Sequence, residues 1–297
     1  FRRSRGLGDV YKRQDFSWAI IQIVKGFVKK VVLADYIAIH FIDKVADAPE
    51  AFPGFISILA MWGYSLQIYG DFSGYTDIAI GVSRLMGFKL LENFNSPYKA
   101  ISVADFWRRW HKSLGSWLRD YLYIPLGGNR SGGIGTYIAT MVILIFLIFI
   151  TQWYWLLFIY LGLMIIYIGV SLLFPGFKRY VHRDLNLIIT MVIGGLWHGA
   201  SENFVIWGAM NGAALIIYNH WRKISPYENS TTLFTRFWRI LITFNFITFT
   251  RIWFRLEDDG APANMLTQIW YHFDLNSDTF NTLMTGFDTT LYVMIFG

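Results

Sequence analysis

The stretch IGTYIATMVILIFLIFITQWYWLLFIYLGLMIIYIGVSLL, residues 134–173, decides the fold of this chain. It lies within 131–177, a run of 47 residues that contains no Asp, Glu, Lys, Arg or His. One helix needs about 20 apolar residues to cross roughly 30 Å of hydrocarbon. The run therefore predicts two membrane spans, near 134–151 and 155–174, joined by a polar and aromatic turn at 152–155.

The flanks of this predicted hairpin give its orientation. Arg130 precedes it, and Lys178, Arg179 and Arg183 follow it. Basic residues next to short loops favour the cytoplasmic side of a membrane. Both outer ends are therefore expected in the cytoplasm, with Trp153 on the opposite side.

The composition of the whole chain agrees with a membrane protein. Of 297 residues, 55% are hydrophobic, 19% are aromatic and 15% are charged, whereas an ordinary soluble domain has about 25% charged residues. Cysteine is absent, which excludes disulfides, thiolate metal sites and a cysteine nucleophile. The basic residues flank apolar segments and form no single stripe, so no nucleic-acid partner is predicted.

The two ends of the sequence differ from the rest. Residues 1–14 hold five basic residues against one acidic residue, without the apolar core of a signal peptide. They resemble the translated read-through of a sequencing adapter, and we expect a non-native leader that packs against nothing. Residues 15–297 are expected to form one partial domain, truncated at both ends, because the last apolar run, 291–296, stops far short of a span.

Other segments are predicted to be helical as well. Residues 16–46 are apolar but carry Lys25, Lys29, Lys30 and Asp35, which fits either a helix with one wet face or a span with cytoplasmic anchors. Further helices are predicted at 54–87, 185–197, 204–221 and 233–254. The predicted fold class is therefore all-α, a polytopic bundle of transmembrane helices.

The segment 88–130 is too polar to span the membrane. Ser102 and Asp105 have the spacing of a capping box, with Asp in place of the usual Glu. From Val103 to Leu118 the apolar residues recur at helical spacing, which predicts one amphipathic helix that is interfacial or re-entrant.

Small residues form a stripe along the predicted helix 54–87. Gly63, Gly70, Gly74 and Gly81 are separated by 7, 4 and 7 residues, so they share one helical face. Small residues four apart let two membrane helices approach closely. The stripe predicts a packed helix interface, and Asp71 and Asp77 flank it.

Two histidines occur where a bilayer normally excludes ionisable side chains. Thirteen residues, 185–197, rise about 20 Å from the basic side, which places His198 inside the bilayer. His111 follows an aromatic and basic segment, 106–110. Ionisable residues at membrane depth are functional by default, although a hydrogen-bonded structural role for His198 and a positioning role for His111 are the alternatives. His40, His182, His220 and His272 are expected to face headgroups.

Four motifs together resemble the membrane-bound O-acyltransferase family, specifically its bacterial alginate O-acetyltransferase-like branch. They are DFSGYTDIAIG at 71–81, ENFNSPY at 92–98, FWRRWH at 106–111 with GGNR at 127–130, and GGLWHGA at 194–200. The resemblance implies that His198 is the catalytic histidine within the membrane. It also implies that His111 is the second signature histidine, at the cytoplasmic mouth of a tunnel around which the helices pack.

The chemistry of acyl transfer is consistent with these histidines. Oxygen attack on a thioester needs a base, and histidine is the usual one because its pKa is about 6.5. The chain has no cysteine and no Gly-x-Ser-x-Gly nucleophile motif. Direct transfer is therefore favoured over a Ser or Cys acyl-enzyme, while a transient acyl-histidine stays open.

Other residues are assigned supporting roles. Asp71, Trp197 and Asn203 are expected to shape or polarise the site. A donor-binding role is expected for four basic residues, which would contact either the phosphates of coenzyme A or anionic lipid headgroups: Arg108, Arg109, Lys112 and Arg130. The histidine spacing predicts no metal site and no bound cofactor.

The predicted function is O-acetylation of an extracytoplasmic polysaccharide such as alginate, in the bacterial cytoplasmic (inner) membrane. By resemblance, acetyl-CoA is the donor and a periplasmic acetylation protein is a partner, besides the membrane lipids. The alternative is a transporter or channel subunit, because intramembrane His and Asp also mark ion paths. Transporters usually contain paired broken helices, and only one of the helices predicted here, 185–197, is interrupted by a Gly-Gly pair.

Overall fold

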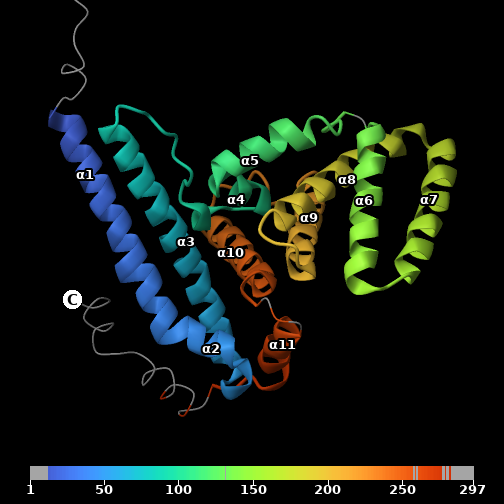
Figure 1. The fold of residues 1–297 in the computed structure, drawn as a ribbon. Helices are drawn as coiled ribbons and strands as arrows, with labels where there is room; N and C mark the ends of the chain where they lie inside the picture. The colour runs from blue at the N-terminus through green and yellow to red at the C-terminus, as the bar shows by residue number, and fades with distance from the viewer. Residues whose placement is uncertain are drawn as a thin grey trace, which may run out of the picture. The chain divides into compact units, whose positions relative to one another are not determined.

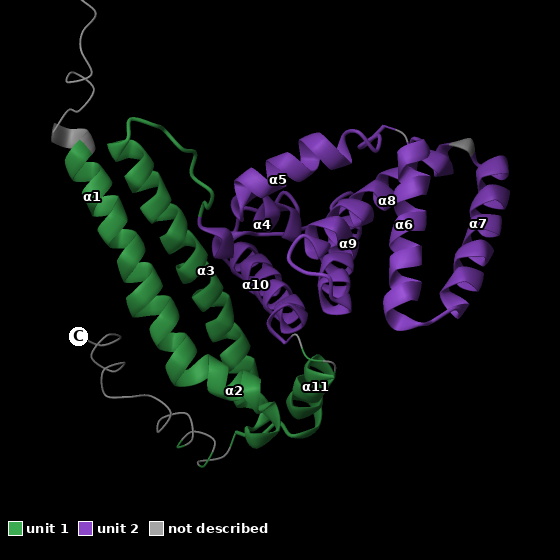
Figure 2. Cartoon of the chain, in the orientation of Figure 1, with its two compact units in different colours: residues 1–95, 258–297 green, residues 96–257 purple. Residues whose placement is uncertain are grey.

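The computed structural model describes residues 13–130, 132–256, 258, 260–275, 278 and 281, without the side chains of 13–15 and 175. All regular structure within these residues is helical (Figure 1), which confirms the all-α part of the prediction. The chain divides into two compact units, residues 1–95 with 258–297, and residues 96–257 (Figure 2). Residues 1–12 of the predicted leader and the apolar run 291–296 lie outside the described residues, while Arg13 and Gln14 begin the first helix.

The first unit is built around two long helical segments. Helix α1, Arg13–Phe27, continues into π-helical turns at Val28–Asp35 and Ala38–Ile42, and then into α2, Asp43–Asp47. Helix α3, Gly54–Leu85, returns along it. The predicted helix at 16–46 is therefore present, but parts of it are widened into π-helix, which is rare and often found at functional places.

Glycine allows α1 and α3 to approach each other closely. A Cβ atom on Gly74 would lie 2.7 Å from the carbonyl oxygen of Gly26, and one on Gly26 would lie 2.5 Å from that of Gly74. A Cβ atom on Gly81 would lie 2.7 Å from the carbonyl oxygen of Ala19. Because residue numbers rise along one helix as they fall along the other, the pair is antiparallel. The predicted glycine interface is confirmed.

Charged side chains pair across the same helix interface. Lys29 Nζ lies 2.6 Å from Asp77 Oδ2, and Gln22 donates to the other oxygen of Asp77 at 2.7 Å. Lys30 Nζ lies 2.5 Å from Asp71 Oδ1. Lys29 and Lys30, in the π-helical turn after α1, are thus paired with the two acidic residues beside the glycine stripe.

Helix α11, Ala261–Tyr271, completes the described part of the first unit. It was not predicted from the sequence. Pro262 lies in its first turn after Gly260, which has a positive φ of 84°. Proline is favoured there because a backbone N–H in the first turn has no partner within the helix, so its absence costs nothing. The N–H of Gly54 donates to the carbonyl of His272 at 3.0 Å, which ties the end of α11 to the start of α3.

The second unit holds the remaining helices. They are α4 (Val103–Arg109), α5 (Lys112–Leu118), a π-helical turn (Arg119–Tyr123), α6 (Ile134–Thr151), α7 (Trp155–Leu173), α8 (Pro175–Leu196), α9 (Glu202–Trp221) and α10 (Leu233–Arg255). Among the described residues, α6 and α7 are the helices long and apolar enough to cross a membrane. Their bounds confirm the predicted hairpin, and almost none of their side chains are buried within the chain.

Helices α8 and α9 pack closely through glycine. A Cβ atom on Gly208 would lie 2.5 Å from the carbonyl oxygen of Met191, and one on Gly195 would collide with the carbonyl oxygen of Phe204. Helix α8 continues through Gly194 and Gly195 to Leu196, so the predicted break at these glycines is wrong. These glycines therefore serve close helix approach, and the residues after Leu196 are held against the start of α9.

A buried polar cluster ties α6, α7 and α8 together around His182, which is 2% exposed. The backbone N–H of Gly132 donates to His182 Nδ1 at 3.0 Å. Because Nδ1 accepts, Nε2 carries the proton and faces the hydroxyls of Tyr137 at 2.8 Å and Tyr167 at 2.9 Å. The prediction that His182 faces headgroups is wrong, because its imidazole is enclosed by these partners.

Candidate active site

His111 lies at a sharp break between α4 and α5. The hydroxyl of Ser102 accepts from the N–H of Asp105 at 3.1 Å, which confirms the predicted N-cap of α4. Helix α4 ends at Arg109, and His111 then adopts a left-handed conformation with φ 43° and ψ 58°. The prediction of one continuous amphipathic helix over 103–118 is wrong, because this residue turns the chain before α5 begins.

His198 follows the C-terminal end of α8 and enters a shell of aromatic rings. Its ring centroid lies 4.8 Å from that of Phe254, 4.9 Å from Trp197 and 5.5 Å from Trp207, all near edge-to-face. Phe204 lies 6.0 Å away. Helices α9 and α10 supply three of these rings, so the close packing of α8 on α9 fixes one side of the imidazole.

The structure brings the two histidines to the same place. The Trp197 ring centroid lies 4.9 Å from that of His198 and 6.0 Å from that of His111, so one tryptophan contacts both histidines. Burial lowers the pKa of His111 to about 4, because desolvation disfavours the imidazolium. His111 is therefore neutral at physiological pH and can accept a proton or a hydrogen bond.

The predicted burial of His198 holds for one side only. Within the described chain the residue is exposed, and Trp197 beside it is 60% exposed. Aromatic rings of α9 and α10 pack against the imidazole, and part of His198 stays exposed within the described residues.

The predicted supporting residues have separate roles. Asn203, 6% exposed, donates from Nδ2 to the carbonyl of Leu256 at 2.9 Å and so ties α9 to the end of α10. Trp197 contacts both histidines, as described above. Asp71 belongs to the first unit, where it pairs with Lys30.

Asp105 organises the basic residues that precede His111. Its Oδ2 accepts from Arg109 Nε at 3.0 Å and from the N–H of Ile101 at 3.2 Å. Arg108, 69% exposed at its side chain, lies 3.6 Å from Oδ1. Lys112 and Arg130 are exposed. The predicted donor-binding residues thus include two arginines that pair with Asp105, one of them exposed, and two further exposed cations.

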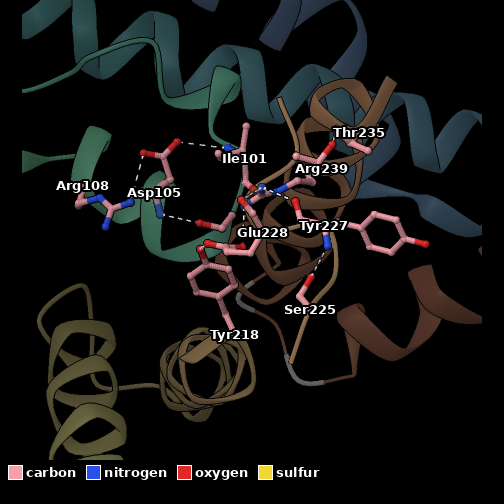
Figure 3. Close-up of polar contacts among 11 residues, drawn as sticks. Ile101, Asp105, Arg108, Tyr218, Ser225, Tyr227, Glu228, Thr235 and Arg239 are labelled. Atoms are coloured by element: carbon pink, nitrogen blue, oxygen red, sulfur yellow. Dashed lines mark hydrogen bonds and ion pairs between the residues drawn. The ribbon is translucent and has the colours of Figure 1, made fainter. Parts of the chain in front are cut away.

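The same segment is anchored to α10 by Arg239 (Figure 3). Its Nε donates to the carbonyl of Ile101 at 3.2 Å, and its Nη2 pairs with Glu228 Oε2 at 2.9 Å. Glu228 also accepts from the hydroxyl of Tyr218 at 2.7 Å. A continuous chain of polar contacts therefore leads from α9 and α10 through Ile101 to Asp105 and the basic turn.

Several residues of the site were not predicted from the sequence. Phe204, Trp207 and Phe254 line His198, and Arg251 is buried against Trp110, the neighbour of His111. The three-residue spacing of Phe204 and Trp207 puts them on one helical face, but the chain contains 26 Phe and 13 Trp. Pairs of aromatic residues are so frequent in this chain that the spacing of Phe204 and Trp207 does not identify them as site residues.

Comparison with known proteins matches the chain to one family. The model of the membrane-bound O-acyltransferase family matches residues 7–174. The probable alginate O-acetylase AlgI of Azotobacter vinelandii is 38% identical over 94% of this chain and 46% of its own length. The peptidoglycan O-acetyltransferase of Helicobacter pylori is 36% identical over 81% of this chain and 36% of its own length.

A more distant relative is the teichoic acid D-alanyltransferase of Bacillus subtilis, 30% identical over 77% of this chain and 48% of its own length. The chain thus spans less than half the length of each of these relatives. The family match covers more than half of the chain, and it agrees with the helical architecture. The chain belongs to the membrane-bound O-acyltransferase family.

Proposed function

We propose that the protein is a membrane O-acyltransferase that takes part in O-acetylation of an extracytoplasmic polysaccharide such as alginate. It would act in the bacterial cytoplasmic (inner) membrane, with acetyl-CoA as donor and a periplasmic acetylation protein as partner. Family membership supports the acyltransferase class, and the alginate O-acetylases among the relatives support the acetyl group and the acceptor.

The observation that carries the proposal is the meeting of His111 and His198 around Trp197. These two residues are 87 positions apart in the sequence, and each needs an unusual local feature to reach the site. His111 needs a left-handed backbone, and His198 needs the close packing of α8 on α9. Such a meeting is expected of a reaction centre.

The arrangement supports a direct transfer. A ring nitrogen of the exposed His198 would remove the proton from the acceptor hydroxyl as its oxygen attacks the thioester carbonyl. The carbon–sulfur bond then breaks, and the coenzyme A thiolate leaves and takes up a proton. General-base catalysis of this kind contributes about 10²–10⁴-fold, and a transient acyl-histidine would use the same residue.

His111 and its basic neighbours fit the donor side of the reaction. Arg108, Lys112 and Arg130 are exposed cations suited to phosphate groups. Arg109 is already held by Asp105, so its role is to orient the turn that carries His111. Anionic lipid headgroups are the other anions that the exposed cations would bind.

The relatives suggest a second set of acceptors. One is a peptidoglycan O-acetyltransferase and another a teichoic acid D-alanyltransferase, so a cell-wall polymer is the alternative acceptor class. A transporter function has less support, because the charged residues of the first helix pair form ion pairs with one another, Lys29 with Asp77 and Lys30 with Asp71.

A labelled acetyl-CoA assay on membranes that contain the protein tests the proposal. His198→Ala is expected to abolish acetyl transfer to alginate, and His111→Ala is expected to weaken it or raise the donor requirement. The matched control is His220→Ala, which removes an exposed histidine paired with Asp184. Near-normal turnover by His198→Ala, at equal amounts of inserted protein, would refute the proposed role.

A further inference from the structure

Arg251 is a charged side chain buried among aromatic rings. It is 4% exposed, although its position near the end of α10 suggests a cation at the membrane surface. Its guanidinium carbon lies 4.7 Å from the ring centroid of Trp110, 5.4 Å from Tyr98 and 5.9 Å from Phe106. A buried charge is costly unless it is compensated, and stacking on several ring faces supplies compensation.

Directed polar contact fixes this guanidinium further. Its Nη1 donates to the hydroxyl of Tyr98 at 2.6 Å. The rings beneath it are themselves packed, with Phe106 and Trp110 stacked at 5.5 Å. Arg251 is therefore held in one position, and it holds Trp110 in turn.

Trp110 is the C-cap residue that follows the last residue of α4. Its N–H donates to the carbonyl of Phe106 at 2.9 Å, and its own φ and ψ are −98° and 130°. The next residue is His111, in its left-handed conformation. Because a non-glycine residue keeps such a conformation only where its surroundings enforce it, fixing Trp110 fixes the direction in which His111 leaves α4.

One helical turn further along α10, Phe254 contacts the other histidine. Its ring lies 4.8 Å from that of His198 and 5.3 Å from that of Trp207. Residues three apart share a face of a helix. A single turn of α10 therefore contacts both sides of the site: Arg251 contacts Trp110, the neighbour of His111, and Phe254 contacts His198.

We propose that the 251–254 turn of α10 is the element that sets the relative position of the two histidines, with Arg251 positioning His111 through Trp110 and Phe254 positioning His198. This assignment rests on the proposed function, because it gives these residues a role in the same reaction. Neither residue contacts substrate in this role. Arg251 is enclosed by rings, and so it is distinct from the exposed cations that would bind the donor.

The variants Arg251→Met and Arg251→Lys test the contact with Trp110. Methionine keeps length without charge, and lysine keeps the charge without the planar guanidinium that stacks on rings. The matched control is Arg236→Met, an exposed arginine on the same helix. Because small misplacements of reacting groups can cost about 10²-fold, Arg251→Met is expected to lower kcat about 10- to 100-fold with an unchanged KM for acetyl-CoA. Arg251→Lys should recover part of that loss, and the control should match wild type.

A double-mutant cycle separates positioning from general destabilisation. If Arg251 acts through Trp110, then Arg251→Met combined with Trp110→Leu should reduce kcat no more than the stronger single variant. Multiplicative losses would contradict the assignment. Phe254→Leu independently tests the contact with His198. It is expected to lower kcat with an unchanged KM for acetyl-CoA. This variant decides the outcome if Arg251→Met does not insert into the membrane.

The outcomes distinguish this inference from the proposed function. If His198→Ala is inactive while Arg251→Met and Phe254→Leu both equal the Arg236→Met control, the function stands and the positioning role is overturned. If the wild-type protein transfers no acetyl group while binding the donor, the proposed function itself fails. A larger KM with unchanged kcat in Arg251→Met would assign Arg251 to donor binding instead.

Discussion

His111 combines a rare backbone conformation with a shifted pKa, and both follow from where the chain places it. Its φ of 43° lies in the left-handed region, which costs roughly 1–2 kcal/mol for most residues, whereas Asn, Asp and His adopt it more readily. The imidazole packs against Trp197 and loses water. This residue therefore turns the chain at the point where the two signature motifs meet.

The pKa of His111 predicts a dependence of stability on pH. Burial lowers it from 6.5 to about 4, so the unfolded chain takes up the proton first as the pH falls. Its contribution to stability is therefore present above pH 6.5 and lost between 6.5 and about 4. His111→Asn removes the titrating group while keeping a residue suited to this backbone conformation.

We expect the melting temperature of wild type in detergent to fall more between pH 7 and pH 4.5 than that of His111→Asn. Both proteins should be scanned in the same buffers, because other groups titrate equally in the two. Parallel pH curves would mean that His111 stays accessible to water in the folded protein.

At the scale of elements, the contact between α1 and α3 depends on the absence of side chains at glycine. Gly74→Ala would place a Cβ atom 2.7 Å from the carbonyl oxygen of Gly26 and 3.2 Å from the Cβ of Lys29, so the helices must separate. Overpacking of this kind costs about 1–3 kcal/mol. We expect a lower melting temperature in detergent for this variant.

Gly162→Ala is the control for this helix pair. It lies in α7, where an added Cβ would meet nothing within 4 Å, and alanine is the better helix former. Its melting temperature should equal or exceed that of wild type. Equal stability of Gly74→Ala and wild type would show that the two helices can part at no cost.

The buried cluster at His182 predicts a second effect on helix packing. His182→Phe keeps an aromatic ring but leaves the N–H of Gly132 and the hydroxyls of Tyr137 and Tyr167 without this partner. An unsatisfied buried group costs about 1–3 kcal/mol. We expect this variant to melt well below His220→Phe, in which an exposed histidine is replaced, and equal melting would contradict the network.

The contrast between these elements explains how much the sequence could predict. The bounds of α6 and α7 follow from hydropathy alone, because 47 residues without charge or histidine leave few alternatives. The break at His111 cannot be predicted from hydropathy, because apolar residues continue to recur every three or four positions on both sides of it. His182 was misplaced because its partners, Gly132, Tyr137 and Tyr167, are distant in sequence and carry no charge.

At the scale of the whole molecule, the second unit holds the proposed reaction centre, and the first holds the ion pairs of Lys29 with Asp77 and of Lys30 with Asp71. The motifs predicted both histidines, but not the aromatic shell or Arg251, because long-range packing of α9 and α10 supplies them. Family membership links both units to one function, since the matched segment, 7–174, includes parts of each.

The orientation of the α6–α7 hairpin in the membrane can be tested directly. The chain contains no cysteine, so a single introduced cysteine carries the whole labelling signal. Arg130 precedes α6, and Lys178 lies in the first turns of α8 after α7, while Trp153 lies in the turn between the two spans. Basic flanks favour the cytoplasm.

We therefore expect Arg130→Cys and Lys178→Cys to react with an impermeant maleimide only in inside-out vesicles or after permeabilisation. Trp153→Cys should react in sealed right-side-out vesicles, and the cysteine-free parent gives the background. Because α6 and α7 each have about the length needed to cross the hydrocarbon, the turn cannot share a side with both ends if both helices span. Labelling of Trp153→Cys and Lys178→Cys from the same face would rule out the hairpin as a membrane-spanning pair.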